Sequence, residues 1–213
     1  GSEMSGGVRN IVVRNCEFLG TDVGLRFKST RGRGGVVENI YIENIRMTDI
    51  ATDAIRFNLF YASSMPDPEA GLRIPAEPVT EQTPRFQNIH MKHIVCRGAE
   101  NAIYIQGLPE MPVHSITMEN VMISADAGVT CIEADGIRFK NVSILPRDGA
   151  LYNFYNARNV TMEQVRSGPA DRLFMKLVGD KTAGIHVDSG KPSILTGRIE
   201  FGRGAGSQAI VRE

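Results

Sequence analysis

A short pattern of alternating apolar residues recurs along most of this chain. Each copy has apolar residues at its second and fourth positions and a polar residue at its sixth. The seventh position is apolar in every copy except the last, where Gly190 stands. Apolar residues two apart are typical of a half-buried β-strand. Seven copies begin at Asn10, Asn39, Asn88, Ser115, Gly136, Asn159 and Gly184.

The spacing of the copies limits the fold. Their starts are separated by 29, 49, 27, 21, 23 and 25 residues, a period typical of solenoids. Most copies are followed by a second short apolar run, such as residues 24–28, 54–57 and 102–105, and no segment has a sustained helical period. We therefore predict an all-β chain, a parallel β-helix of about seven coils with two or three short strands per coil. The alternative, a β-sandwich, needs closely spaced hairpin turns such as Asn-Gly, which are missing.

The recurring asparagines fit this interpretation, because Asn accepts the left-handed backbone of a tight turn and its amides can bond between stacked coils. Asn141 and Asn159 each begin an N-glycosylation triplet, but both fall in the repeat pattern. We interpret them as turn residues and not as glycan sites.

The length favours a single β-helix domain over residues 1–213, interrupted once. Residues 60–85 account for the longest spacing and contain five of the ten prolines. Such a segment cannot continue a sheet, so a large loop is expected there. Loops on a rigid scaffold often carry binding groups, although a loop without a role is the alternative.

Composition excludes several classes of protein. Lys plus Arg number 24 and Asp plus Glu number 24, so the chain lacks the broad basic field that nucleic-acid binding requires. No apolar run is long enough to span a membrane. The three cysteines, Cys16, Cys96 and Cys131, lie in apolar runs without metal-ligand spacing and are expected to be buried thiols. We predict no metal and no cofactor.

Two stretches resemble glycoside hydrolase family 28, the polygalacturonases and related pectin hydrolases. Residues 1–8 read Gly-Ser-Glu-Met-Ser-Gly-Gly-Val, and Arg26-Phe27-Lys28 follows in a predicted strand. The family has four signature blocks, Asn-Thr-Asp, Asp-Asp, Gly-His-Gly and Arg-Ile-Lys, and the tripeptide is similar to the fourth with Phe in place of Ile. The resemblance implies a right-handed, pectin lyase-like β-helix in a secreted or periplasmic enzyme that hydrolyses galacturonate-containing polysaccharide.

The first three blocks have no counterpart in this chain. An inverting glycosidase needs one carboxylic acid to protonate the leaving oxygen and one carboxylate to activate water, and in this family the absent blocks supply them. Glu3 lies near the expected site but is a single carboxylate. Asp22 and Asp53 are interpreted as turn residues with loose ion pairs to Arg26 and Arg56. We therefore expect the C-terminal half of a catalytic β-helix that has no catalytic residue and is inactive alone.

Substrate binding is a separate matter. On a strand, Arg26 and Lys28 share one face while Leu25 and Phe27 share the other, so two cations project together. Arg can hold a uronate carboxylate with two parallel hydrogen bonds, and Lys adds a point charge. The resemblance also assigns a substrate-binding role to Tyr61. The partner is thus expected to be a pectic oligo- or polysaccharide.

Two further expectations concern function and assembly. The competing function is a non-catalytic carbohydrate-binding or structural β-helix. The first coil, with Ile11, Val13, Cys16 and Phe18, would present an open end, so we predict a homodimer through it. Residues 202–206 read Gly-Arg-Gly-Ala-Gly and are expected to form a polar, flexible finish.

Overall fold

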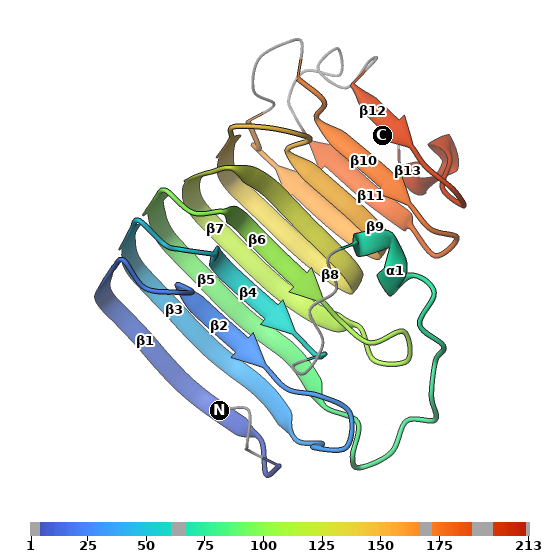
Figure 1. Ribbon diagram of the computed structural model, residues 1–213, viewed down its shortest axis with the longest axis horizontal. Coiled ribbons are helices and arrows are strands. Elements are labelled where there is room, and N and C mark those ends of the chain that lie inside the picture. Colours follow the sequence, from blue (N-terminus) through green and yellow to red (C-terminus); the bar gives the residue numbers. More distant parts are fainter. Residues whose placement is uncertain (1–4, 61–66, 167–171, 189–197, 212–213) are drawn as a thin grey trace.

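The structure, a computed structural model, describes residues 5–60, 67–166, 172–188 and 198–211. It is built almost entirely of β-strands, with one short α-helix, α1 (Pro68–Gly71), and a 3₁₀ turn at Ser207–Ala209 (Figure 1). The strands are β1 (Val8–Leu19), β2 (Leu25–Lys28), β3 (Val36–Thr48), β4 (Asp53–Asn58), β5 (Arg85–Arg97), β6 (Asn101–Gln106), β7 (Val113–Ala125), β8 (Ala127–Pro146), β9 (Tyr152–Glu163), β10 (Met175–Val178), β11 (Ala183–Asp188), β12 (Ile199–Phe201) and β13 (Ile210–Val211).

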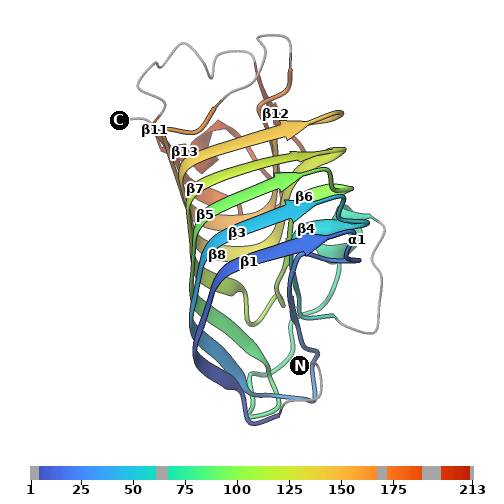
Figure 2. The same ribbon diagram turned by 90° about the vertical axis from the view of Figure 1, so that its left-hand side faces the viewer.

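Every pairing between these strands is parallel, and each strand pairs with its counterpart one coil away. The repeat positions lie in register, so that Ile11 pairs with Ile40 and Ile40 with Ile89. Figure 2 shows β1, β3, β5 and β7 stacked side by side along the molecule. These findings confirm the predicted parallel β-helix. Within the described residues the seven predicted coils follow one another, beginning at β1, β3, β5, β7, residue 134 of β8, residue 157 of β9, and β11, and the short β13 begins an eighth.

The bends between sheets lie inside long strands. The backbone is left-handed at the first and sixth positions of the pattern, as at Asn10 (φ 58°) and Asn15 (φ 55°). Pairing continues across these bends, so β1, β3, β5, β7, β8 and β9 reach 12 to 20 residues and are not the short strands predicted. The bend residues bond between coils, as where Asn44 Nδ2 donates to Asn15 Oδ1 over 3.1 Å.

The two glycosylation triplets are part of the same bends. Asn141 and Asn159 both have left-handed backbone, and their side-chain amides donate to Asn120 and Asp135 on the preceding coil. Their interpretation as turn residues is confirmed.

Apolar residues of every coil point inward and form one continuous core. Phe27 stacks on Phe57 with ring centroids 4.3 Å apart, and Phe86 packs edge-on against both. Cys96 and Cys131 are buried in this core, as predicted, and burial raises the pKa of the Cys96 thiol to about 11. Cys16, on β1, is only half-buried.

Charged residues alternate in sign along one outward row of the long strands. Each member pairs with the next across neighbouring coils, and the row ends where Asp188 of β11 stands opposite Glu163, like charge against like. Opposite charges placed directly across a strand pair stabilise a sheet. The row consists of Arg14, Glu43, Lys92, Glu119, Lys140 and Glu163.

The expected flexible finish at residues 202–206 is wrong. β12 pairs with β10 and β13 pairs with β11, so the helix continues beyond the last recognised repeat. Residues 202–206 form the connection between β12 and the 3₁₀ turn, with Gly204 at a left-handed φ of 83°. Gly is favoured there because a Cβ would lie 2.3 Å from Asp180 Oδ1.

Candidate functional site

Polar side chains gather on the outward face of the sheet formed by β2, β4 and β6. Leu25 is buried, whereas Arg26 on the same strand is exposed and Lys28 half-buried, so both cations lie on the outer side as predicted. The register places Arg56 and then Tyr104 beside Arg26, and Asn58 and then Gln106 beside Lys28. We call this set the polar face: Arg26, Lys28, Arg56, Asn58, Tyr104 and Gln106.

The two arginines of the polar face are held by acids in different ways. Arg26 Nη1 lies 3.6 Å from Asp22 Oδ2, and both side chains are well exposed, which is the loose pair expected. Arg56 Nη1 lies 2.7 Å from Asp53 Oδ2, and the Asp53 side chain is only 2% exposed. The interpretation of Asp53 as a loosely paired turn residue is therefore wrong. Asp53 begins β4 and lies inside the fold, where burial raises the pKa of its carboxyl although Arg56 counteracts this.

Tyr104 continues the row beyond Arg56. The Arg56 guanidinium lies over the Tyr104 ring, 5.3 Å from its centroid. The Tyr104 hydroxyl donates to Gln106 Oε1 over 3.1 Å, and burial raises its pKa to about 12, so the phenol stays protonated. The Arg26 row therefore combines cations and a neutral phenol, whereas Asn58 and Gln106 in the neighbouring row are buried, 7% and 1% exposed.

Beyond Tyr104 its row stays polar, with Thr130, Asn153 and Lys176, whereas the neighbouring row becomes apolar after Gln106. Ile132, Tyr155 and Val178 form a small cluster outside the main core, and Tyr104 and Leu72 pack against it. Leu72 directly follows α1, and a Cβ on Gly71 of α1 would lie 3.0 Å from the Ile132 side chain. Gly71 and Leu72, in the part of the chain between β4 and β5 that the structure describes, thus lie against this apolar cluster. We call residues 67–84 the insertion segment.

An ion cluster ties the insertion segment to the rest of the fold. Arg31 lies 2.8 Å from Glu77 and donates two hydrogen bonds of 2.8 Å to Glu110, whose side chain is 5% exposed. It also donates to the Pro75 carbonyl over 3.0 Å. Burial alone would raise the pKa of Glu110, but the hydrogen bonds from Arg31 and its charge hold that pKa below the usual value.

A hollow of about 480 Å³ opens beside the insertion segment, at the bends inside β8 and β9 and the turn that follows β10. The Glu133 carboxylate, 3% exposed, accepts hydrogen bonds from Asn156 (2.6 Å) and from Lys181 (3.2 Å). Burial raises the pKa of Glu133, outweighing these two partners. Acids and bases both line the hollow, so its charge favours no single class of ligand.

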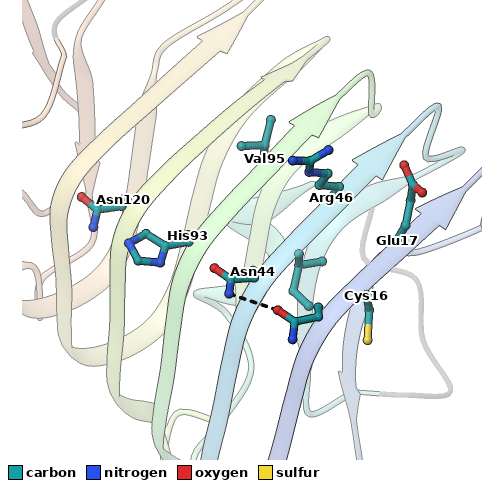
Figure 3. A pocket seen from close by; sticks show the side chains of 9 residues that line it. Cys16, Glu17, Asn44, Arg46, His93, Val95 and Asn120 are labelled. Atoms are coloured by element: carbon teal, nitrogen blue, oxygen red, sulfur yellow. Dashed lines mark hydrogen bonds between the residues drawn. The ribbon is translucent and has the colours of Figure 1, made fainter.

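A second hollow, of about 650 Å³, lies on another face, along the bends of β1, β3, β5 and β7. Figure 3 shows its side chains arranged coil by coil, with Asn44, His93 and Asn120 following one another along the bend. Its acidic and basic side chains are Glu17 and Arg46, which have opposite charges, so it presents no cluster of one sign. The hollow is lined by the left-handed bend residues Asn15, Asn44, His93 and Asn120 and by their neighbours, so the shape of the bend accounts for it.

Two residues singled out from the sequence, Tyr61 and Glu3, lie outside the described residues. Arg56, Tyr104 and Gln106 were missed. The repeat itself carried the signal, since aligning residues 25–28 with residues 55–58 and 103–106 places them in the same two columns. No described set of three His, Cys, Asp or Glu side chains is arranged to hold a metal ion, and no described helix could cross a membrane.

Fold and face together define a parallel β-helix protein with cations gathered on one outward sheet face. The sequence profile of glycosyl hydrolases family 28 matches residues 1–141. The chain therefore belongs to glycosyl hydrolases family 28, which confirms the resemblance carried by residues 1–8 and 26–28.

Two curated relatives give the extent of this similarity. A probable polygalacturonase of Vitis vinifera is 27% identical over 144 residues, which are 64% of this chain and 27% of the relative. A polygalacturonase of Chamaecyparis obtusa is 24% identical over 178 residues, which are 78% of this chain and 28% of the relative. The chain thus spans about a quarter of the length of the curated relatives it matches. No solved structure matches it significantly.

Proposed function

We propose that this chain is part of a glycoside hydrolase that cleaves galacturonate-containing pectic polysaccharide by an inverting acid/base mechanism. In this proposal the chain binds substrate carboxylates through Arg26 and Lys28, and Tyr61 assists, but it supplies no catalytic carboxylate. The observation that carries the proposal is the position of Arg26 and Lys28 side by side on the outward face of β2, within the segment matched by the family.

The geometry around Arg26 supports carboxylate binding. Its partner Asp22 is 71% exposed and 3.6 Å away, which is a weak surface pair that an incoming carboxylate can replace. A guanidinium holds a carboxylate through two parallel hydrogen bonds, and Lys28, two residues along the same strand, adds a second positive charge. Uronate carboxylates would then be recognised, and neutral sugars would not.

The acids of this region support the absence of a catalytic pair. An inverting mechanism needs a protonated acid and a free carboxylate placed on opposite sides of the scissile bond. Asp22 is paired with Arg26, and Asp53 is buried against Arg56. Each acid orients a cation of the face, so neither serves as acid or base.

We further propose that the enzyme acts outside the cytoplasm, secreted or periplasmic, where its polymer is found.

Binding of trigalacturonate by isothermal titration calorimetry tests the proposal. Arg26→Gln should weaken binding by about tenfold, the usual scale for a charged hydrogen bond of about 1.5 kcal/mol. Arg46→Gln, which removes an arginine from another face, is the matched control and should leave affinity unchanged. The methyl-esterified trimer should bind as weakly as the Arg26→Gln variant binds the acid. Equal binding of acid and ester would refute carboxylate recognition.

Hydrolysis assays separate this proposal from the competing one. General acid and base groups contribute about 10²–10⁴-fold each, so the chain alone should release no reducing sugar from polygalacturonate. Release abolished by Glu3→Gln would overturn that expectation. The competing function is a non-catalytic carbohydrate-binding or structural β-helix. Binding of neutral sugars in preference to uronates, or no binding of either, would favour it.

We also propose that the chain forms a homodimer through β1. In the described part of the chain β1 pairs with β3 alone, and it exposes Ile11 (40%) and Val12 (64%) beside its outer edge. Strand edges with apolar side chains pair readily with other strands, and identical edges can meet about a two-fold axis.

A further inference from the structure

We infer that the Arg26 row is a binding strip with two unlike ends, which selects pectic chains whose charge is unevenly distributed. One end binds uronate carboxylates, and the other accepts galacturonate rings whose carboxylate is methyl-esterified. The inference deepens the proposed function and rests on it. The strip follows β2, β4, β6, β8, β9 and β10 through register partners, namely Arg26, Arg56, Tyr104, Thr130, Asn153 and Lys176.

The strip is accessible along its length. Arg26 is exposed, and every later member is half-buried. Neighbouring strands are about 4.8 Å apart, so the strip runs about 24 Å from Arg26 to Lys176, the length of several sugar rings. The neighbouring row is closed, since Gln106 and Ile132 are each 1% exposed and Leu72 packs on the cluster that contains Ile132. A polymer that lies along the strip therefore meets one side chain of each coil in turn.

The β2 end of the strip presents guanidinium groups to carboxylates. Arg26 and Arg56 are register partners, so successive uronates of one chain can each meet a guanidinium on successive coils. The exposed pair of Arg26 with Asp22 is weak. The Asp53 bond occupies Nη1 of Arg56, and a guanidinium has five N–H donors, so other donors can meet a carboxylate.

The middle of the strip offers only uncharged groups. The Tyr104 phenol stays protonated, and Thr130 on the next strand carries a hydroxyl. Asn153 donates a hydrogen bond to the Val129 carbonyl over 3.3 Å, so its amide oxygen can accept one from a sugar. These groups can exchange hydrogen bonds with sugar hydroxyls. None is a cation, so none offsets the cost of taking a carboxylate out of water.

The far end of the strip is flanked by acids. Lys176 Nζ lies 3.8 Å from Glu69 Oε1 of α1 and 3.6 Å from Glu200 Oε1 of β12, and these two acidic side chains are about half exposed. Asp67, a third acid on the same side, lies 3.8 Å from Arg73. Three acids thus stand against two cations at this end.

Tyr155 reports the negative field of these acids. It lies in the row beside the strip, and burial together with the charges of Glu69, Asp67 and Glu200 raises the pKa of its phenol. A carboxylate placed at Lys176 meets one cation and two nearby acids. A methyl ester carries no charge for them to repel, so the far end favours esterified rings.

Two block hexagalacturonates test the inference by isothermal titration calorimetry. Each has three consecutive acids and three consecutive methyl esters, and the acids are at the reducing end of one isomer and at the non-reducing end of the other. A chain bound in one direction can match the strip with one isomer only. That isomer should bind about tenfold more tightly than the other, and at least as tightly as the fully acidic hexamer.

The outcomes separate the inference from the proposed function. Equal affinities of the two isomers, or tightest binding of the fully acidic hexamer, would overturn the inference. If trigalacturonate still binds and loses affinity in Arg26→Gln, the proposed function survives that result. If trigalacturonate does not bind, the proposed function fails and the inference falls with it.

Thr130→Val tests whether the middle of the strip contacts the esterified rings. This change removes a hydroxyl with little change of shape, so the favoured hexamer should bind about two- to tenfold more weakly while the affinity for trigalacturonate is unchanged. Thr117→Val, at a half-buried threonine of β7 outside the strip, is the matched control and should change neither affinity. Unchanged binding of the hexamer by Thr130→Val would contradict the contact.

Removal of the flanking acids tests the far end. The double variant Glu69→Gln and Glu200→Gln should bind the fully acidic hexamer about two- to fivefold more tightly and leave trigalacturonate unchanged. Glu17→Gln, at an exposed acid on another face, is the control. Circular dichroism establishes that each variant keeps its strands. Unchanged affinity of the folded double variant for the acidic hexamer would overturn the assignment of the far end.

Discussion

Arg26 of β2 and Arg56 of β4 stand directly opposite each other in the parallel register, each held by its own acid. Neighbouring strands are about 4.8 Å apart, and like charges placed directly across a strand pair repel. Asp22 and Asp53 offset that repulsion from the two sides. The pair of arginines is thus tolerated in the protein.

Asp22 competes with the substrate for Arg26. Asp22→Asn removes an exposed acid whose pair with Arg26 is worth less than about 1 kcal/mol, so trigalacturonate should bind about two- to fivefold more tightly. Asp126→Asn removes an acid from a similar exposed pair with Arg147, remote in sequence from the face, and should have no effect. Calorimetric titration measures the affinity of both variants for trigalacturonate. Weaker binding by Asp22→Asn would contradict the competition between Asp22 and the substrate.

We expect Asp53 to matter for both stability and binding, because it holds Arg56. Asp53→Ala leaves Arg56 without its 2.7 Å partner, so the free energy of unfolding should fall by about 1–3 kcal/mol in urea denaturation. Binding of trigalacturonate should weaken as well, because Arg56 loses the group that orients it. The exposed Asp22→Asn is the control for stability. A loss of stability without any loss of affinity would show that Arg56 does not contact the trimer.

The raised pKa of Glu133 predicts a pH-dependent stability. The Glu133 carboxyl keeps its proton to a higher pH in the folded protein than in the unfolded chain, where its pKa is 4.5. Protonated Glu133 therefore contributes its full stabilisation to the free energy of unfolding below pH 4.5. It is lost as pH rises through the folded pKa. Glu133→Gln should therefore gain stability relative to the wild type between about pH 4 and pH 7.

Glu163 provides a control of opposite sign for this experiment. A hydrogen bond from Arg138 lowers the pKa of Glu163, so its contribution is present above its ordinary pKa and lost as pH falls. Glu163→Gln should lose stability relative to the wild type over the same rise in pH. Urea denaturation at the two pH values measures both, and parallel curves for Glu133→Gln and the wild type would contradict burial as the dominant effect.

Pairing through β1 predicts the oligomeric state. Light scattering at micromolar concentration should give the mass of a dimer for the wild-type chain and of a monomer for Val12→Lys. A charge on the exposed outer side of an edge strand opposes edge-to-edge pairing. The control is Val79→Lys, which places the same charge at an exposed valine of the insertion segment and should remain dimeric. Val79 is 54% exposed and Val12 is 64% exposed. A monomeric wild type would end this proposal.

The repeat was sufficient to predict the fold because its signal is local. Alternation of apolar residues defines the strands, and a polar residue at a fixed position defines each bend, so the register of Ile11 with Ile40 follows from alignment alone. The same alternation placed Arg26 and Lys28 outward. Strands of two or three residues, such as β12 and β13, are too short to show a period, which is why the final coil was missed.

The missing parts of the site depend on contacts between distant segments. Nothing in the neighbourhood of Asp53 indicates that it is buried, since this results from the packing of the coils on both sides. Leu72 is one apolar residue in a proline-rich segment, and its place against Ile132 becomes visible only in three dimensions. Patterns within one coil predict the scaffold, whereas the contact of Leu72 with the sheet depends on a segment that leaves the coil.

The alternating row of charges limits how a helix of this kind can change in length. If the coil that carries Lys92 were deleted, Glu43 would stand opposite Glu119, and deleting the coil of Glu43, Glu119 or Lys140 alone would likewise bring two like charges together. Removing two adjacent coils restores the alternation, and so does duplicating two. We therefore expect coils along this row to be gained and lost in pairs, which makes an even step the unit of evolutionary growth.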